Sequence, residues 1–185
     1  MSAPLTPDGS PPLRTAVLVV SDRAAAGTHE DTSGKEAQKI LAGWGADVAH
    51  CEIVPDDTDA IRERLLHYAD RDRLDLAVTT GGTGFAPRDI TPEATRGLLE
   101  KEAPGLSELL RRETTRFTRF APLSRGVAGI RGKTMIINLP GSPRGVVQCL
   151  EILKPLLPHA IRVLRGDPDG HDPRTQSSPG SDPGS

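Results

Sequence analysis

Cysteine is scarce in this chain, and its two cysteines form no recognisable motif. Cys51 and Cys149 lie far apart in the sequence and make no CxxC pair. The five histidines form neither HxxxH nor HExxH, the spacings that place two zinc ligands on one face of a helix. The sequence therefore argues against a zinc site, and we expect both cysteines to be reduced, buried and inert.

Long apolar runs and basic stripes are also missing. No apolar run approaches the roughly 20 residues that a membrane-spanning helix needs, and residues 1–12, MSAPLTPDGSPP, do not have the pattern of a secretory signal. The formal net charge is -2, with charged residues making up 26% of the chain, which argues against a nucleic-acid binder. We therefore expect a cytoplasmic protein whose partners include neither a membrane nor a nucleic acid.

Two tails flank a segment that is long enough for one domain. The chain has 185 residues, enough for one domain with a substantial core. Residues 1–12 are rich in proline, and residues 167–185 contain no aliphatic or aromatic residue. Such segments bury too little apolar surface to offset the entropy of ordering. We expect disordered tails at 1–12 and 167–185 and a folded domain over residues 13–166.

Strand patterns and helix patterns alternate along this domain. Continuous β-branched and aliphatic runs at 15–20, 74–79 and 134–139 are typical of strands covered on both faces. A further strand is expected at 46–54, with Ala49, Cys51 and Ile53 on one face, whereas 120–133 reads as irregular. Helices with one apolar face fill the intervals, and one of them turns Phe117 inward. This alternation predicts a three-layer α/β/α sandwich with a mainly parallel central sheet.

The segment 78–93, VTTGGTGFAPRDITPE, combines a strand end, a glycine-rich turn and a helix start. Its glycines allow backbone N–H groups to approach a bound group closely. Thr91 is expected to cap the helix that begins with Pro92 and Glu93. In parallel sheets, ligands bind at the carboxyl ends of the strands. The segment therefore predicts an anion site, although GGTG alone is equally consistent with a tight strand-to-helix turn.

Two aspartates follow strand ends and are expected at this same edge. Asp56 and Asp89 are candidate Mg²⁺ ligands beside a phosphate site. The ordinary alternatives are a helix-proximal cap for Asp56 and an ion pair with Arg88 for Asp89. Asp57 is the better cap candidate, which leaves Asp56 freer for another role.

Two further loops hold polar residues that suit a binding site. Arg125, next to Ser124, is a candidate anion clamp, with a solvated surface arginine as the alternative. Ser142 either donates to a ligand or shapes its turn. The chain has neither a Walker A motif nor the dinucleotide-binding fingerprint, because Pro87 stands where the third glycine would be. A GxSxG nucleophile elbow is absent too.

Four segments, in this order, resemble the MogA/MoaB family of molybdenum cofactor biosynthesis. They are SDRAAAGTHEDTSG, TTGGTGFAPRDITPEAT, LSRGVAGIRGKT and NLPGSPRGV. The resemblance covers nearly all of residues 13–166 and includes the related G domains of plant and animal proteins. It implies a three-layer α/β fold, a homotrimer, and binding of molybdopterin, a pterin dithiolene with a terminal phosphate.

The resemblance also implies a reaction and assigns residues to it. Molybdopterin and ATP, with Mg²⁺, would give adenylyl-molybdopterin and pyrophosphate. Asp56 and Asp89 match the family's catalytic acids, and the resemblance implies that they also bind Mg²⁺. The ligand-binding loops are matched by Gly81, Gly82, Thr83, Gly84, Ser124, Pro140, Gly141 and Ser142.

Three other functions are weighed against this one, and one of them is a generic nucleotide-binding module. A MoaB-like branch of the family keeps the pterin-binding scaffold, so a non-catalytic pterin-binding trimer is the alternative. The short segment between Cys149 and Ile161 is similar to that branch, whereas the VPDD and PRDIT motifs are retained. A pterin-4-alpha-carbinolamine dehydratase is another alternative, but its own family uses an adjacent histidine pair, which this sequence lacks.

Overall fold

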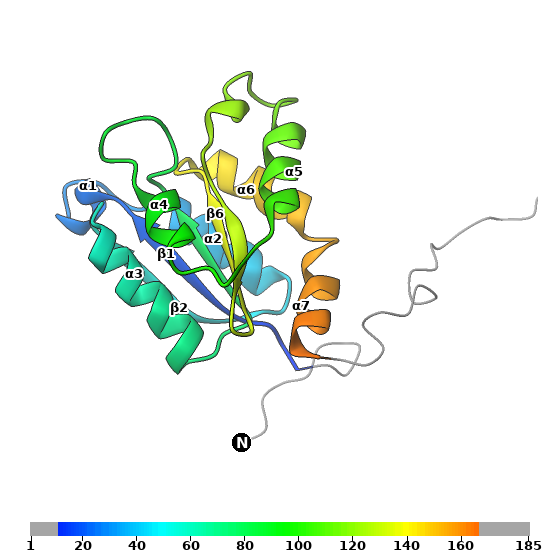
Figure 1. Cartoon of the computed structure of the whole chain (residues 1–185). Helices are drawn as coiled ribbons and strands as arrows, with labels where there is room; N and C mark the ends of the chain where they lie inside the picture. The colour runs from blue at the N-terminus through cyan, green and yellow to red at the C-terminus, as the bar shows by residue number, and fades with distance from the viewer. Residues whose placement is uncertain (1–10, 167–185) are drawn as a thin grey trace, which may run out of the picture.

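Six strands form one sheet in the order β2-β1-β3-β6-β5-β4. The computed structural model describes residues 11–166, so nearly all of both predicted tails lies outside the described part. The strands are β1 (Arg14–Val20), β2 (Asp47–Val54), β3 (Leu76–Thr80), β4 (Lys101–Glu102), β5 (Ala128–Arg131) and β6 (Thr134–Leu139). β2, β1, β3 and β6 run parallel, and β5 and β4 continue the sheet antiparallel. The predicted fold class is confirmed (Figure 1).

Helices cover both faces of this sheet. In chain order they are α1 (Asp22–Ala25), α2 (Ser33–Gly43), α3 (Thr58–Leu66), the π-helical turn η1 (His67–Arg71), α4 (Thr91–Arg96), α5 (Pro104–Thr114), the 3-10 turn η2 (Ala121–Leu123), α6 (Pro143–Leu153) and α7 (Leu157–Arg165). No helix among residues 11–166 combines the length and apolarity that crossing a membrane requires.

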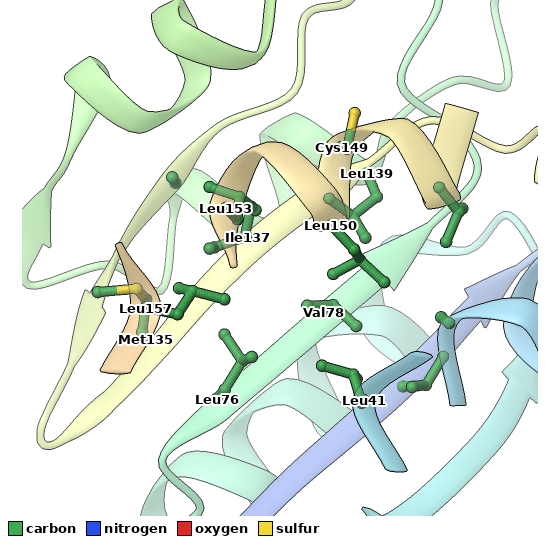
Figure 2. Packing of buried hydrophobic residues seen from close by; sticks show 14 of the residues in the cluster. Leu41, Leu76, Val78, Met135, Ile137, Leu139, Cys149, Leu150, Leu153 and Leu157 are labelled. Atoms are coloured by element: carbon green, nitrogen blue, oxygen red, sulfur yellow. The ribbon is translucent and has the colours of Figure 1, made fainter. Parts of the chain in front are cut away.

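Two buried clusters hold the three layers together. On one face, side chains of β1, β3 and β6 pack against α2, α5, α6 and α7, and Figure 2 shows Val78 and Ile137 facing Leu150 and Leu153 in this layer. On the other face, alternate residues of the same strands pack against α3, η1 and α4. Both faces of the central strands are thus apolar, which explains why these strands are unbroken hydrophobic runs in the sequence.

The antiparallel edge is the part of the sheet that the sequence did not indicate. The segment 120–133, expected to be irregular, contains η2 and the strand β5, which pairs with β6 through a tight Gly132-Lys133 turn. β5 has only four residues and β4 only two. Strands this short carry too little pattern to be distinguished from a loop.

Other local expectations were wrong where tertiary packing decided the outcome. Cys51 is exposed, because Ala49, Cys51 and Ile53 lie on an uncovered face of the edge strand β2; Cys149 is buried as expected. Phe117, expected to point inward, follows the end of α5 and is 43% exposed.

Candidate functional site

The carboxyl ends of β1, β3 and β6 meet at one edge of the sheet. The chain passes from β1 to β2 on one side and then crosses to β3 on the other, which creates the switch point where α/β sheets bind ligands. A Cβ on Gly81 would lie 2.2 Å from the carbonyl oxygen of Val20, and one on Gly141 would lie 3.2 Å from the Cα of Gly81. Glycine at position 81, where φ is +107°, is therefore what allows the strand ends to touch.

A cavity of about 220 Å³ opens at this edge and is rich in charged groups. Asp56, Asp89, Gly81, Gly82 and Gly141 all line it. The structure thus brings together the two acids and three of the glycines that the sequence singled out, although their catalytic roles remain predictions. The cavity also contains acidic and basic residues that the sequence reasoning did not select, namely Asp22, Arg23, His29, Glu30, Asp31 and Arg88.

Asp56 is held by a reciprocal pair of hydrogen bonds to Asp22. The Asp22 N–H donates to Asp56 Oδ2 at 2.9 Å, and the Asp56 N–H donates to Asp22 Oδ1 at 2.9 Å. Asp57 caps α3 by accepting from the Ala60 N–H at 2.9 Å, so the capping alternative for Asp56 is wrong. Asp22 had a readable signal in the sequence, because it lies two residues after the end of β1, at the start of α1.

Asp89 lies in a loop that Arg125 holds in place. The Ala86 N–H donates to Asp89 Oδ2 at 2.8 Å. The Arg125 guanidinium donates to the carbonyl oxygens of Gly84, at 2.7 Å, and of Asp89, and it also pairs with Glu93. Arg125 is therefore neither the predicted anion clamp nor a solvated arginine, because its donors are used to fix the glycine loop.

Thr91 does not cap α4 in the way the sequence predicts. Ile90 takes the cap position without a side-chain hydrogen bond, and Thr91 is the first residue of α4. The Thr91 N–H donates to the Gly82 carbonyl at 3.1 Å, while the buried Thr91 Oγ1 has no partner among the described residues. A Cβ on Gly82 would lie 2.3 Å from that oxygen, so a side chain at position 82 would displace the glycine loop.

Three consecutive amides of the glycine loop are left for a ligand. Within the described part of the chain, the N–H groups of Gly82, Thr83 and Gly84 donate to no protein acceptor. Backbone amides grouped in this way form concave sites that bind anions. The sequence prediction of an anion site at GGTG therefore gains a specific set of donors.

A second and larger cavity, of about 520 Å³, lies on the other half of the glycine loop. Thr83, Gly84, Ser124, Pro140 and Ser142, five residues that the sequence singled out, line it. Its remaining wall comes largely from α5, α6, η2 and the segment between α5 and η2. This wall includes apolar residues that sequence reasoning missed, namely Leu110, Phe117, Phe120 and Leu123. The sequence offered no signal for these, because they line the cavity only once α5, η2 and α6 have packed against one another.

Several wall residues of the larger cavity are fixed by hydrogen bonds. Arg111 on α5 donates to the carbonyl oxygens of Ser124 and Gly126 at 3.3 and 3.0 Å. Ser142 Oγ accepts from the Gly145 N–H at 3.2 Å and caps α6, which is the turn-shaping role. Burial raises the pKa of the Cys149 thiol to about 12, so this lining residue is a neutral thiol rather than a reactive thiolate at neutral pH.

Comparison with protein families identifies the domain. Residues 16–159 match the family model described as a probable molybdopterin binding domain. The chain is 44% identical over 157 residues to molybdopterin adenylyltransferase of Helicobacter pylori strain J99, covering 84% of this chain and 89% of that protein. It is 45% identical over 152 residues to the Drosophila melanogaster molybdenum cofactor synthesis protein cinnamon, covering 82% of this chain but only 25% of that longer protein.

Solved structures agree with this assignment. A molybdopterin biosynthesis enzyme MoaB from Thermus thermophilus superposes with a TM-score of 0.80 at 51% identity, covering 84% of this chain and 98% of that one. The molybdopterin biosynthesis Mog protein of Mycobacterium ulcerans superposes with a TM-score of 0.78 at 35% identity, covering 85% and 100%. These matches confirm the resemblance seen in the four sequence segments, and the chain belongs to the MogA/MoaB family of molybdopterin-binding proteins of molybdenum cofactor biosynthesis.

Proposed function

We propose that this protein is a molybdopterin adenylyltransferase. In the proposed reaction, a terminal phosphate oxygen of molybdopterin attacks the α-phosphorus of ATP. The bond from that phosphorus to the bridging oxygen breaks, and pyrophosphate leaves with the bonding electrons. The products are adenylyl-molybdopterin and pyrophosphate.

The observation that carries this proposal is the glycine loop shared by two unlike cavities. Gly81 and Gly82 line the acidic cavity, whereas Thr83 and Gly84 line the larger one. The free amides of residues 82–84 therefore lie between the two, where the reacting phosphates of two substrates would meet. We assign the pterin to the larger cavity, whose apolar wall suits a ring system, and the ATP phosphates to the acidic one.

We also assign a magnesium ion to the acidic cavity, because Asp56 and Asp89 both line it. Asp56 and Asp89 each use Oδ2 to accept a backbone N–H, and within residues 11–166 neither Oδ1 takes part in a hydrogen bond. Carboxylate oxygens of this kind are the ligands that Mg²⁺ prefers, so these two residues would hold it. The ion would neutralise charge on the phosphate oxygens.

The chain itself contributes mainly positioning to the proposed reaction. The amides of the glycine loop would hold phosphate oxygens, and Arg125 would keep the loop rigid while they do so. Preorganised donors of this kind stabilise developing charge without reorganising. Phosphoryl chemistry depends chiefly on such alignment and charge neutralisation.

Pyrophosphate release tests the proposal. Purified protein is given ATP, Mg²⁺ and molybdopterin, and the wild type is compared with Asp56→Asn and Asp89→Asn. Asparagine can still accept the backbone hydrogen bond, so the substitution removes charge with little change of shape. We expect kcat to fall by about 100-fold or more in both variants, and to stay within about twofold in the control Asp59→Asn, which lies on the exposed face of α3.

The same assay separates transfer from binding alone. Saturable molybdopterin binding without pyrophosphate release by the wild type would contradict the proposal and support the scaffold function of the MoaB-like branch. Loss of molybdopterin binding as well would contradict the assignment of the larger cavity.

We also propose the homotrimer and the cytoplasmic location that the family resemblance implies. Exposed apolar side chains at the rim of the larger cavity, Phe120 and Leu123 among them, supply surface for contact between copies. Light scattering on the purified chain should give three times the monomer mass, and a monomeric mass at micromolar concentration would contradict the trimer.

A further inference from the structure

A cluster of His50, His67 and Asp72 lies outside both cavities. One ligand atom from each residue can be chosen so that all three lie within 4.8 Å of one another. His50 comes from the edge strand β2, His67 begins η1, and Asp72 follows η1. None of the three lines the acidic or the larger cavity, so the proposed reaction does not use them. We propose that this cluster is a binding site for a divalent transition metal, with Zn²⁺ the best match.

The π-helical turn is what brings His67 and Asp72 together. In an α-helix, side chains five positions apart point in different directions, because each residue turns the helix by about 100°. In a π turn the hydrogen bond runs from i+5 to i, and here the Asp72 N–H donates to the His67 carbonyl at 3.0 Å. His67 Nε2 consequently lies 3.4 Å from Asp72 Oδ2. Such turns inside helices are frequent at functional sites.

The ligand His50 is already oriented by a second carboxylate. Its Nε2 lies 2.7 Å from Asp72 Oδ2, and its Nδ1 lies 3.3 Å from Glu52 Oε1. Glu52 is in turn bound by the Arg64 guanidinium, and the His50 ring stacks on Tyr68 at 5.2 Å between centroids. A metal-binding histidine commonly donates its other ring nitrogen to a carboxylate, which fixes its tautomer and direction.

The donor set and its spacing suit zinc. Two imidazole nitrogens and one carboxylate oxygen are borderline ligands that favour Zn²⁺ over Mg²⁺. Tetrahedral zinc with bonds of about 2.0–2.1 Å holds its ligand atoms about 3.3 Å apart. His67 Nε2 and Asp72 Oδ2, at 3.4 Å, already have this separation. His50 Nε2 and Asp72 Oδ2, at 2.7 Å, have to move apart by roughly half an ångström, and the ligand nitrogens of the two histidines lie within 4.8 Å of each other.

The cluster is accessible to solvent, so an ion can reach it and a water molecule can serve as the fourth ligand. The side chains of His50, His67 and Asp72 are 28%, 42% and 25% exposed. The inference runs against the expectation from the sequence, because these ligands are 17 and 5 positions apart and match no helical zinc spacing. A bound ion would join the edge strand β2 to the turn that leads into β3.

Zinc titration of the full chain tests the site. Tag-free, chelator-treated protein is titrated with ZnCl₂ in competition with a chromophoric chelator, and with CoCl₂ for its visible absorption. We expect one tightly bound Zn²⁺ per chain, and a Co²⁺ spectrum of four-coordinate intensity. His67→Ala and Asp72→Asn should weaken Zn²⁺ binding by about 100-fold, whereas the matched control His159→Ala, on α7, should change it less than about twofold.

Two further measurements keep the test decisive. In long-range ¹H–¹⁵N spectra, Zn²⁺ should shift the ring signals of His50 and His67 and leave those of His29 and His159 in place. Asp56→Asn serves as a control for metal binding in the acidic cavity and should leave this Zn²⁺ affinity unchanged. Absence of saturable binding in the wild type, equal affinity in His67→Ala, or loss of binding only in Asp56→Asn would each overturn the proposal and leave the cluster as an ordinary histidine–aspartate contact.

Discussion

The two halves of the candidate site are built in different ways. The acidic cavity is formed by short loops at the ends of parallel strands, where backbone amides and carboxylates are fixed by local hydrogen bonds. The larger cavity is walled by α5, η2 and the start of α6, so its shape depends on how these helices pack. The charged groups thus lie on loops that the strand ends position, which is where binding and catalytic residues concentrate, and the recognition surface depends on how α5, η2 and α6 pack.

This contrast explains which residues were visible in the sequence. Glycine and aspartate directly after an apolar run mark a strand end, so the acidic half can be recognised from sequence. The larger half is lined by leucine and phenylalanine, which look the same whether they fill a core or line a pocket.

The strongest test of the comparison is a change in the loop that the two halves share. In Gly81→Ala, the new Cβ meets the Val20 carbonyl oxygen at 2.2 Å, and φ at this position is +107°. Both effects act on backbone that cannot move aside, so we expect the free energy of unfolding to fall by about 3 kcal/mol or more. Urea denaturation followed by circular dichroism measures it.

A matched glycine in α5 controls for the added methyl group. A Cβ on Gly105 meets nothing within 4 Å and its φ is ordinary, so Gly105→Ala should be neutral or stabilise by up to about 1 kcal/mol. Equal stability of the two variants would show that the ends of β1 and β3 can move apart to accommodate a methyl group. The glycine loop would then not hold the two cavities in a fixed arrangement.

The second prediction concerns only the acidic half. Asp22→Ala removes the carboxylate that accepts the Asp56 N–H and frees the loop that holds Asp56. We expect kcat for pyrophosphate release to fall by about 10- to 30-fold, because a lost hydrogen bond to a charged group costs about 1.5–2 kcal/mol, with molybdopterin affinity unchanged. Steady-state kinetics measures kcat, and a direct binding assay measures the affinity for molybdopterin. Glu108→Ala, an exposed change on α5, should alter neither kcat nor molybdopterin affinity. An equal fall in kcat in that variant would contradict a specific role for Asp22.

The third prediction concerns only the larger half. Arg111→Ala removes the donors to the Ser124 and Gly126 carbonyls and loosens that wall. We expect KM for molybdopterin to rise by about 5- to 10-fold, corresponding to about 1 kcal/mol, with kcat within about twofold. The neighbouring Arg112→Ala, which removes an exposed arginine, is the control. A fall in kcat without a change in KM would mean that the two halves are not separable.

The smallest expected effect compares the two cysteines. Cys51 is exposed, whereas Cys149 lines the larger cavity with a pKa raised by burial to about 12. Partial burial raises the pKa of Cys51 as well, but iodoacetamide at pH 8 should still modify Cys51 well before Cys149, which should stay intact until the chain is unfolded, as peptide mass spectrometry can show. Because the unfolded thiol ionises first, at about pH 8.5, this cysteine should also lower the free energy of unfolding, by less than about 1 kcal/mol between about pH 8 and pH 9. Rapid labelling of Cys149 in the folded protein would mean that helix α6 is not firmly packed.

The failures of sequence reasoning share a physical cause. Thr91 has the residue type of a helix cap, but the turn at Gly82 takes its N–H and leaves its hydroxyl without a partner among the described residues. Arg125 has the chemistry of an anion clamp, but three acceptors of the glycine loop and of α4 surround it. In both cases the sequence correctly indicated a side chain able to form hydrogen bonds, but contacts with residues far away in the sequence determined what that side chain does.

The sequence by itself determined the layered α/β fold, the family, and the presence of glycines and acids at strand ends, because these follow from hydrophobic periodicity and from residues that lie close together along the chain. Only the tertiary structure decided that the glycine loop separates two cavities, that Asp22 holds Asp56, and that His50 meets His67 and Asp72. These contacts join segments that are far apart in sequence or turned by an irregular helix, and their geometry exists only after the sheet and its helices have packed.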